Sequence, residues 1–456
     1  MFSLKSFKNA TPGSVRELFV IAAPMMISTA CDGIMTFTDR FFMAKLAPEQ
    51  MNAVMAGGIT MQTMCFFFIG LTSYSTALVA QYFGKGEKHK SAAAAFQAAL
   101  VTLAAWPIII ALKPLAVALF DISDIPPMQA LYQREYLNVL VMGCVFGMMR
   151  YTIGCYFSGI GRTGVVMLAT IAALFTNIFL DYILIFGKFG FAPMGISGAA
   201  LATISGNICA LLVLFAVYFE KSNRRNFSIL SSFHFDKVIM KKLIRFGSPA
   251  GVEFFLNFVI FTILTGIFHS CGDVAATAIT IMFSWDLVTF IPLLGIEISV
   301  TSLVGRYLGA KRPDIAYNSA ISAVKTGLFF SSAVLIIFVF AAKPLVYVFA
   351  PDGYNHIFEQ AAPAAINMIR IASFYVLAEA VMVAFIGTLR GAGDTFFSMA
   401  ASVTMHLFIL PVVYLSLKVF NMPIEVAWSL LVACFLIFCT VLSFRFKSGK
   451  WKNIAI

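Results

Sequence analysis

Residues 76–84 read Thr-Ala-Leu-Val-Ala-Gln-Tyr-Phe-Gly, and residues 301–309 read Thr-Ser-Leu-Val-Gly-Arg-Tyr-Leu-Gly. The two stretches correspond position by position at an offset of 225 residues, and the same offset relates Pro24 to Pro249. Further matches follow in order, and the offset changes only across loops. Lys113-Pro-Leu matches Lys343-Pro-Leu at an offset of 230. At an offset of 232, Gly159, Gly161 and Thr163 match Gly391, Gly393 and Thr395. Ordered matches of this kind predict an internal duplication.

The composition places both copies in a membrane. The chain has 456 residues, of which 60% are hydrophobic and only 12% are charged, with a mean hydropathy of +0.91. A soluble domain carries roughly a quarter charged residues, and a membrane-spanning helix needs about 20 apolar residues. We therefore predict an all-α integral membrane protein with twelve spans, at 16–44, 53–83, 92–120, 130–157, 165–187, 198–219, 243–269, 276–305, 318–349, 362–388, 396–417 and 425–445.

The basic residues predict the orientation of these spans. Of the 32 Lys and Arg residues, 22 fall in segments on the side of both termini, six fall on the opposite side and four fall within spans. Because Lys and Arg accumulate in cytoplasmic loops, we expect both termini to be cytoplasmic and the protein to lie in the plasma membrane. The net charge of +11 is divided among short loops, so it does not indicate a nucleic-acid partner.

An offset of six spans gives the two copies the same orientation. We predict two six-helix, pseudo-symmetric lobes around a central cavity, with residues 1–220 as the N-lobe, 221–242 as a cytoplasmic linker and 243–456 as the C-lobe. Parallel repeats of this kind suit alternating access. The sequence contains no nucleotide-binding loop, and its eight cysteines lack metal or disulfide spacing. We expect no cofactor and no enzymatic activity.

Apart from acids near the span ends, seven acidic residues are assigned to the predicted spans, against four basic ones, although a charge at the bilayer centre costs at least about 2.5 kcal/mol. Several of these acids must therefore titrate, hold a cation or face water. Asp39 lies six residues before Lys45, and Asp181 lies seven before Lys188, so both sit roughly 10 Å from the outer edge. Thr203 lies at the same depth, Asn177 lies one turn before Asp181, and Asp32 lies two turns before Asp39 on the same face. We therefore predict a site for a hard cation such as Na⁺, or for a proton, formed by Asp39, Asn177, Asp181 and Thr203, with Asp32 nearby.

A second group of acids lies in the C-terminal half, near the middle of its spans. We predict that it contributes negative charge to a substrate or proton cavity; its members are Glu253, Asn257, Asp286, Glu297 and Glu379. The alternative is that these carboxylates are neutralised by neighbours, for example Glu379 by Arg370.

The sequence resembles the multidrug and toxic compound extrusion (MATE) family over nearly its whole length. The resemblance rests on Thr38-Asp39, the 78–84 segment, the 177–187 segment, the 195–203 segment and Gly387-Thr-Leu-Arg-Gly-Ala-Gly-Asp-Thr395. It implies a two-lobed antiporter that exports organic, often cationic, drugs in exchange for Na⁺ or H⁺.

The resemblance also implies two candidate coupling sites. In one branch of the family the cation site uses residues matching Asp39, Asn177, Asp181 and Thr203. In another branch, acids matching Glu253 and Glu379 are implicated, and this chain has both sets. It departs from the pattern at Arg40, where a small polar residue is more usual, and at Tyr151 and Gly154, which stand where some members have asparagines. Asp286 and Glu297 lie outside the pattern.

We therefore predict a secondary active multidrug antiporter that works as a monomer in the lipid bilayer on small organic cations. The alternative is a lipid-linked oligosaccharide flippase of the same superfamily, which would carry a strongly basic cavity. The excess of in-span acids over bases favours cation export. An integral-membrane enzyme would need a His- or Cys-based site that the sequence does not contain, and a channel or receptor is a further alternative.

Overall fold

A computed structural model describes residues 10–46, 48–122, 126–351 and 356–454. Nearly all of these residues are helical, and none of the described residues forms a strand. Twelve helical segments are long and apolar enough to cross a membrane, as predicted. They are Val15–Ala44, Gln50–Gly84, Lys88–Ala118, Pro127–Gly159, Thr163–Phe186, Gly195–Tyr218, Lys237–His269, Asp273–Gly309, Pro313–Phe340, His356–Ala392, Thr395–Val419 and Ile424–Lys447.

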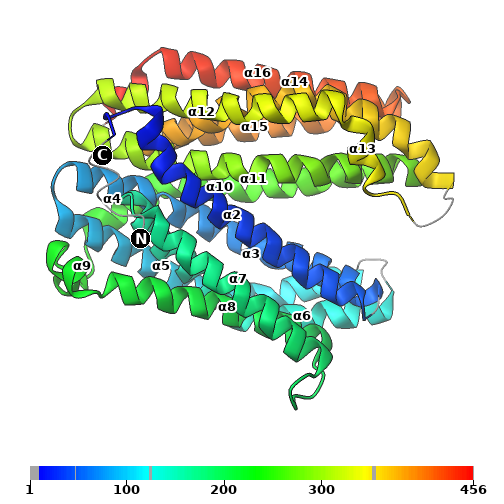
Figure 1. Ribbon diagram of the computed structural model, residues 1–456, viewed down its shortest axis with the longest axis horizontal. Coiled ribbons are helices and arrows are strands. Elements are labelled where there is room, and N and C mark those ends of the chain that lie inside the picture. Colours follow the sequence, from blue (N-terminus) through cyan, green and yellow to red (C-terminus); the bar gives the residue numbers. More distant parts are fainter. Residues whose placement is uncertain (1–9, 47, 123–125, 352–355, 455–456) are drawn as a thin grey trace.

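The N-terminal half contains eight of the labelled helical elements of Figure 1. They are α2 (Val15–Ala44), α3 (Pro48–Ser73), α4 (Ser75–Gly84), α5 (Lys88–Ile122), α6 (Pro127–Gly159), α7 (Thr163–Phe186), α8 (Gly195–Tyr218) and α9 (Lys221–Asn226). The second span is divided at Tyr74 into α3 and α4. The helix α9 and the short 3₁₀ turn η1 (Ile229–Ser232) belong to the segment that was predicted as the linker.

The C-terminal half repeats this order. It contains α10 (Lys237–His269), α11 (Asp273–Gly309), α12 (Pro313–Phe340), α13 (Ala342–Tyr347), α14 (His356–Ala392), α15 (Thr395–Tyr414), the π turn η2 (Leu415–Val419), α16 (Ile424–Lys447) and the 3₁₀ turn η3 (Lys450–Asn453). Most boundaries differ from the prediction by a few residues, and one of the differences has a clear local cause. The helix α10 begins at Lys237 rather than 243, because Asp236 caps it by accepting hydrogen bonds from two backbone amides. The predicted ninth span is divided at Ala341 into α12 and α13.

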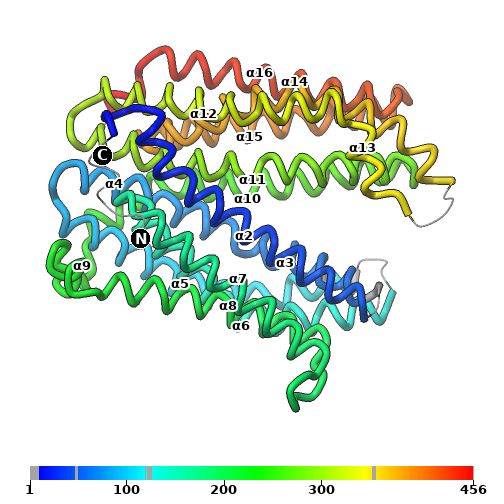
Figure 2. Tube along the Cα trace, viewed as in Figure 1, coloured from blue at the N-terminus to red at the C-terminus, as the bar shows by residue number. Residues whose placement is uncertain are grey.

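The two halves pack their helices in the same pattern. The pair α2 and α7 in the N-terminal half corresponds to α10 and α15 in the C-terminal half, and α3 with α6 corresponds to α11 with α14. In the same way, α6 with α8 corresponds to α14 with α16, and α7 with α8 corresponds to α15 with α16. The contacts between the halves are reciprocal too, since α2 packs on α11 and α3 packs on α10. Helices α5–α8 lie in the lower part of Figure 2 and α12–α16 in the upper part. The exact limits of the two lobes stay a prediction.

The halves meet closely at the end where α2 begins and α16 ends, which we call the terminus end (left in Figure 1). A Cβ atom on Gly84 would overlap the carbonyl oxygen of Arg306, and one on Gly309 would overlap that of Gln81. The offset of 225 relates Gly84 to Gly309 and Gln81 to Arg306, so the two contacts are equivalent in the repeat. Gln81 also donates a hydrogen bond of 3.0 Å to the carbonyl of Gly391. Two glycines therefore let α4 and α11 cross with their backbones in contact, and close this end.

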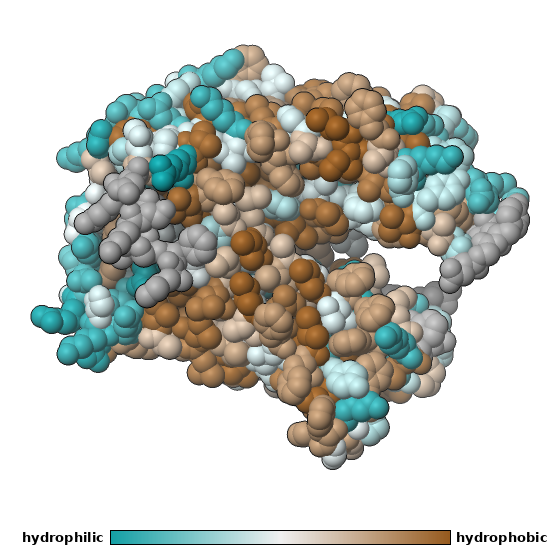
Figure 3. Space-filling view, viewed as in Figure 1, coloured by the Kyte–Doolittle hydropathy of each residue, from teal (hydrophilic) through white to brown (hydrophobic). Residues whose placement is uncertain are grey.

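The opposite end is open. Figure 3 shows a gap between the upper and lower halves at the right of the view, with hydrophobic residues over the middle of the molecule and hydrophilic residues gathered toward its ends. Halves that are separated toward one end and packed together at the other have the arrangement of one of the two states that alternating access requires.

Candidate functional site

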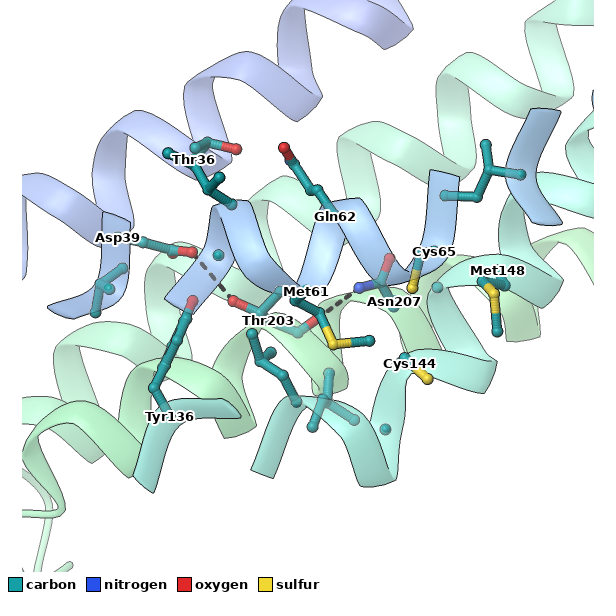
Figure 4. A pocket seen from close by; sticks show the side chains of 18 of the residues that line it. Thr36, Asp39, Met61, Gln62, Cys65, Tyr136, Cys144, Met148, Thr203 and Asn207 are labelled. Atoms are coloured by element: carbon teal, nitrogen blue, oxygen red, sulfur yellow. Dashed lines mark hydrogen bonds between the residues drawn. The ribbon is translucent and has the colours of Figure 1, made fainter. Parts of the chain in front are cut away.

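Three helices of the N-terminal half bring together the predicted cation ligands. The helix α2 supplies Asp39, α7 supplies Asn177 and Asp181 one turn apart, and α8 supplies Thr203. The amide of Asn177 donates to Asp39 Oδ1 at 3.1 Å. The hydroxyl of Thr203 donates to Asp39 Oδ2 at 3.1 Å, and Figure 4 shows this second bond. All of these side chains are buried except Thr203, which is half-buried. The structure thus places the four residues in one cluster.

Asp181 is the exceptional member of this cluster. Its carboxyl group lies beside that of Asp39 and is fully buried, yet neither of its oxygens has a hydrogen-bond partner among the described residues. The side-chain oxygen of Asn177 lacks a partner in the same way. Leaving a buried polar group unsatisfied costs roughly 1–3 kcal/mol, and more when the group is charged. Two adjacent carboxylates in this environment need a proton or a cation.

The donor set fits both candidates. Four carboxylate oxygens, an amide oxygen and a hydroxyl oxygen are hard ligands, which bind Na⁺ in preference to soft metals. The same pair of carboxylates can instead share a proton, because two buried carboxylates in contact resist ionising together. The geometry offers one site for one positive charge, and it is compatible with either ion.

This cluster borders a cavity of about 320 Å³ in the N-terminal half. Its walls come from α2, α3, α6 and α8, and Asp39, Tyr136 and Thr203 lie on them (Figure 4). Asn177 and Asp181 are not among the lining residues. Asp39 therefore stands between the cavity and Asp181, where it can respond to a charge on either side.

Asp32 lies apart from this cluster. It forms an ion pair of 3.0 Å with Arg150 of α6, and its side chain is 43% exposed. Two helical turns separate it from Asp39, which is about 10 Å along the helix axis, so a shared helix face does not bring the two carboxylates together. Arg150 lines both the first cavity and a deeper one of about 80 Å³, which places the Asp32–Arg150 pair between the two.

The acids of the C-terminal half divide into two clusters. In the first, Arg390 of α14 contacts Glu297 of α11 and lies 3.5 Å from Glu253 of α10. Ser398 also donates to Glu253, at 3.3 and 3.4 Å to its two oxygens. All three charged side chains are buried. Arg390 follows the predicted span 362–388 and was one of the 22 basic residues assigned to the cytoplasmic segments. That assignment was wrong, because α14 continues to Ala392 and the two carboxylates hold the guanidinium inside.

In the second cluster, the hydroxyl of Tyr375 contacts Asp286 Oδ1 and lies 3.1 Å from Glu379 Oε1. The other oxygen of Glu379 is buried without a partner among the described residues. The pairing of Glu379 with Arg370, which the sequence offered as an example, is not what the structure shows: Arg370 is exposed, whereas Glu379 is buried and bonded to Tyr375. Asn257 belongs to neither cluster and donates to Ser402 at 2.7 Å.

Sequence reasoning missed Tyr375 and Arg390. Tyr375 lies four residues before Glu379, so the helical period would have placed its hydroxyl on the same face. Arg390 gave no such signal, because it stands at the end of an apolar run, where a basic residue usually marks the membrane surface.

Comparisons with known proteins agree on one family. The MatE family model matches residues 24–183 and 249–415, two segments whose starting points differ by the repeat offset of 225. The chain is 26% identical over 457 residues to the probable multidrug resistance protein NorM of Thermotoga maritima, covering 98% of this chain and 96% of the relative. It is 25% identical over 385 residues to the multidrug resistance protein PmpM of Pseudomonas aeruginosa, covering 84% and 79%. A crystal structure of MATE in complex with MaL6 superposes with a TM-score of 0.88 at 19% identity, covering 98% and 100%.

Proposed function

The chain belongs to the MatE family, and we propose that it is a secondary active multidrug efflux antiporter. It exports organic, often cationic, compounds in exchange for Na⁺ or H⁺. The names of its relatives, which are multidrug resistance proteins, support the efflux part of this proposal. The observation that carries the ion coupling is the buried Asp39–Asp181 pair, whose oxygens need a positive charge.

We propose that Asp39 couples the ion to the drug. A drug cation in the cavity is held by the aromatic and methionine side chains of its walls and by the negative charge of Asp39. When Na⁺ or H⁺ binds between Asp39 and Asp181, it neutralises this charge and weakens the hold on the drug. By reciprocal linkage, a bound drug cation weakens ion binding to the same degree. The two cargoes then exclude each other, as antiport requires.

Helix α2 is the element that would carry this coupling to the rest of the molecule. It bears Asp39 near one end, contains Pro24 and packs on α11 of the other half near its beginning. A proline within a helix removes one backbone hydrogen bond and lowers the cost of bending there. Occupation of the Asp39–Asp181 site can thus change the position of α2 against α11 without contact between ion and drug.

The C-terminal acids are proposed to add negative charge behind the cavity. If all groups are ionised, the cluster of Glu253, Glu297 and Arg390 carries a net charge of −1, and Glu379 with Asp286 carries more. Such charge attracts organic cations and disfavours anionic substrates. This is the observation that makes a flippase of anionic lipid-linked sugars the weaker candidate, since that cargo needs a basic cavity.

We further propose that the protein acts as a monomer in the plasma membrane with both termini in the cytoplasm. Support for the placement of the termini comes from the distribution of basic residues between the loops and from the even number of spans. On this orientation the closed terminus end faces the cytoplasm, and the open end faces outward, where a drug is released and an ion enters.

Counterflow of ethidium in proteoliposomes tests the proposal. A Na⁺ gradient and a pH gradient are imposed separately, and dye movement is followed for the wild type and for Asp181→Asn. We expect one of the two gradients to drive dye uptake in the wild type and neither to drive it in the variant. Dye movement that ignores both gradients would rule out the antiport mechanism.

A further inference from the structure

The closed terminus end contains two junctions that the internal repeat makes equivalent, yet one pair of equivalent positions carries opposite charges. At the first junction, Glu17 of α2 accepts a hydrogen bond of 2.6 Å from Tyr307 of α11. At the second, Lys242 of α10 lies 5.6 Å from the ring of Tyr82 in α4. The offset of 225 maps Glu17 onto Lys242 and Tyr82 onto Tyr307. An acid in one junction is therefore replaced by a base in the other.

The first junction is complete within the protein. The second carboxylate oxygen of Glu17 accepts a hydrogen bond of 2.7 Å from the backbone amide of Gly13. Glu17 is 4% exposed, and it joins the beginning of α2, in one half, to α11 in the other. One carboxylate thus links the two halves at this point.

The second junction collects positive charge instead. Lys85 and Lys90 lie 5.6 and 5.8 Å from the same Tyr82 ring that Lys242 approaches. The repeat equivalents of Lys85 and Lys90 are Ala310 and Ile315, which carry no charge. The cations near the first junction are Arg306 and Arg312, and there the Glu17 carboxylate lies among them. Lys85 and Lys90 belong to the N-terminal half and Lys242 to the C-terminal half, which makes this cluster a crossing point between the halves.

Among the described residues, two acids face the three lysines, and both have other partners as well. Glu87 forms an ion pair of 2.9 Å with Lys90, and this contact lowers the pKa of Glu87 and keeps it ionised at neutral pH. Asp236 faces Lys242, but it caps α10 through hydrogen bonds of 2.8 and 3.0 Å to the amides of Val238 and Ile239. These five described side chains together carry a net charge of +1, and like charges from opposite halves repel each other across the closed junction.

The surroundings of the cluster are suited to a lipid. Val238 lies one turn before Lys242 on the same face of α10 and is 64% exposed. Phe235, just before α10, is 63% exposed. Exposed apolar side chains beside lysines at a helix end are typical of the level of the membrane where acyl chains meet headgroups.

We propose that the phosphate headgroup of an anionic phospholipid binds to Lys85, Lys90 and Lys242 and completes the second junction as the Glu17 carboxylate completes the first. A phosphate diester offers oxygens to several ammonium groups at once. Bound there, it links the two halves and stabilises the state in which the terminus end is closed. When this end opens, Lys242 separates from Lys85 and Lys90, and the lipid can no longer bind to both halves.

Thermal unfolding of the purified full-length protein in detergent tests this site, with phosphatidylglycerol, phosphatidylcholine or inorganic phosphate added. A ligand that binds only the folded state raises the melting temperature. We expect phosphatidylglycerol to raise it most in the wild type, and the rise to fall below half in Lys242→Gln and in the double variant Lys85→Gln/Lys90→Gln. Lys447→Gln, a basic residue at the end of α16, is the matched control and should respond as the wild type does.

A second variant separates loss of the site from loss of folding. In Lys242→Glu the new carboxylate reproduces the arrangement at Glu17 and can bind Lys85 and Lys90 directly. We expect this variant to be at least as stable as the wild type without added lipid and to gain little from phosphatidylglycerol. An equal phosphatidylglycerol response in all variants would overturn the proposal. A response to inorganic phosphate as large as that to phosphatidylglycerol would overturn the assignment of a lipid. Neither result depends on transport, so the test stands apart from the proposed antiport.

Discussion

The two halves share a packing pattern, but they treat their buried carboxylates differently. In the N-terminal half, Asp39 receives hydrogen bonds from neutral side chains, and Asp181 has no partner among the described residues. In the C-terminal half, Arg390 lies between Glu253 and Glu297, and Tyr375 lies between two further acids. A duplicated scaffold has thus produced one site that still requires a positive charge and another, around Arg390, in which the protein itself supplies one.

This difference suggests a division of roles between the halves. A carboxylate pair without a protein counter-charge gains or loses a proton or a cation readily, as a coupling site must. A carboxylate fixed to a buried arginine is costly to change, because removing one partner leaves the other charged and buried. We therefore expect substitutions in the N-terminal half to affect coupling, and substitutions around Arg390 to affect folding.

The largest effect is expected for Asp181→Asn. The amide keeps the size of the side chain but removes the charge that a proton or Na⁺ would balance, so ion-driven ethidium efflux should be abolished. The melting temperature should stay close to that of the wild type, because the buried charge that is lost had no partner in the protein. Undiminished ion-driven efflux by this variant would disprove the coupling site.

The next largest effect is expected for Arg390→Gln, and it concerns stability. Breaking a buried ion pair by removing one partner costs roughly 3–5 kcal/mol. Thermal unfolding in detergent should show this loss as a much lower melting temperature. Adding Glu253→Gln and Glu297→Gln to the same chain should recover most of it, since no unpaired charge then remains. If the triple variant is no more stable than the single one, the three residues do not act as a charge cluster.

An intermediate effect is expected for the double variant Glu253→Gln/Glu379→Gln. It removes negative charge from both C-terminal clusters while keeping shape and most hydrogen bonds. Efflux of a cationic dye should fall by about 5–150-fold, the usual range of an energetic coupling between sites, while efflux of any neutral substrate should fall less. Cation efflux at the wild-type rate would show that these acids only stabilise the lobe.

The smallest effect is expected for Asp32→Asn. Its ion pair with Arg150 is partly exposed, with the Asp32 side chain 43% accessible, and such pairs contribute about 0–1 kcal/mol. Ion-driven efflux should fall about fivefold at most, and the ion preference should not change. A loss as complete as that of Asp181→Asn would place Asp32 in the coupling site, contrary to its position in the structure.

Much of the architecture was predictable because it depends on short-range patterns. The number of spans follows from the length of apolar runs, since lipid leaves the backbone no partner other than itself. The duplication follows from ordered matches such as those of 76–84 with 301–309. The depth of Asp39, Asn177, Asp181 and Thr203 follows from a constant rise per residue, and the structure does bring these four together.

The sequence alone determined which residues are charged, how deep they lie and that the chain folds as two copies of one unit. Only the tertiary structure decided which charges meet. Arg390 is buried because Glu253 and Glu297 approach it from two other helices, and Asp32 pairs with Arg150 rather than joining Asp39. The physical reason is that the position of a residue along its helix fixes its depth and its face. Which side chain it meets on another helix depends on how the packed helices are rotated and how they cross. Rotation and crossing depend in turn on contacts between residues far apart in the chain, such as that of Gly84 with Arg306.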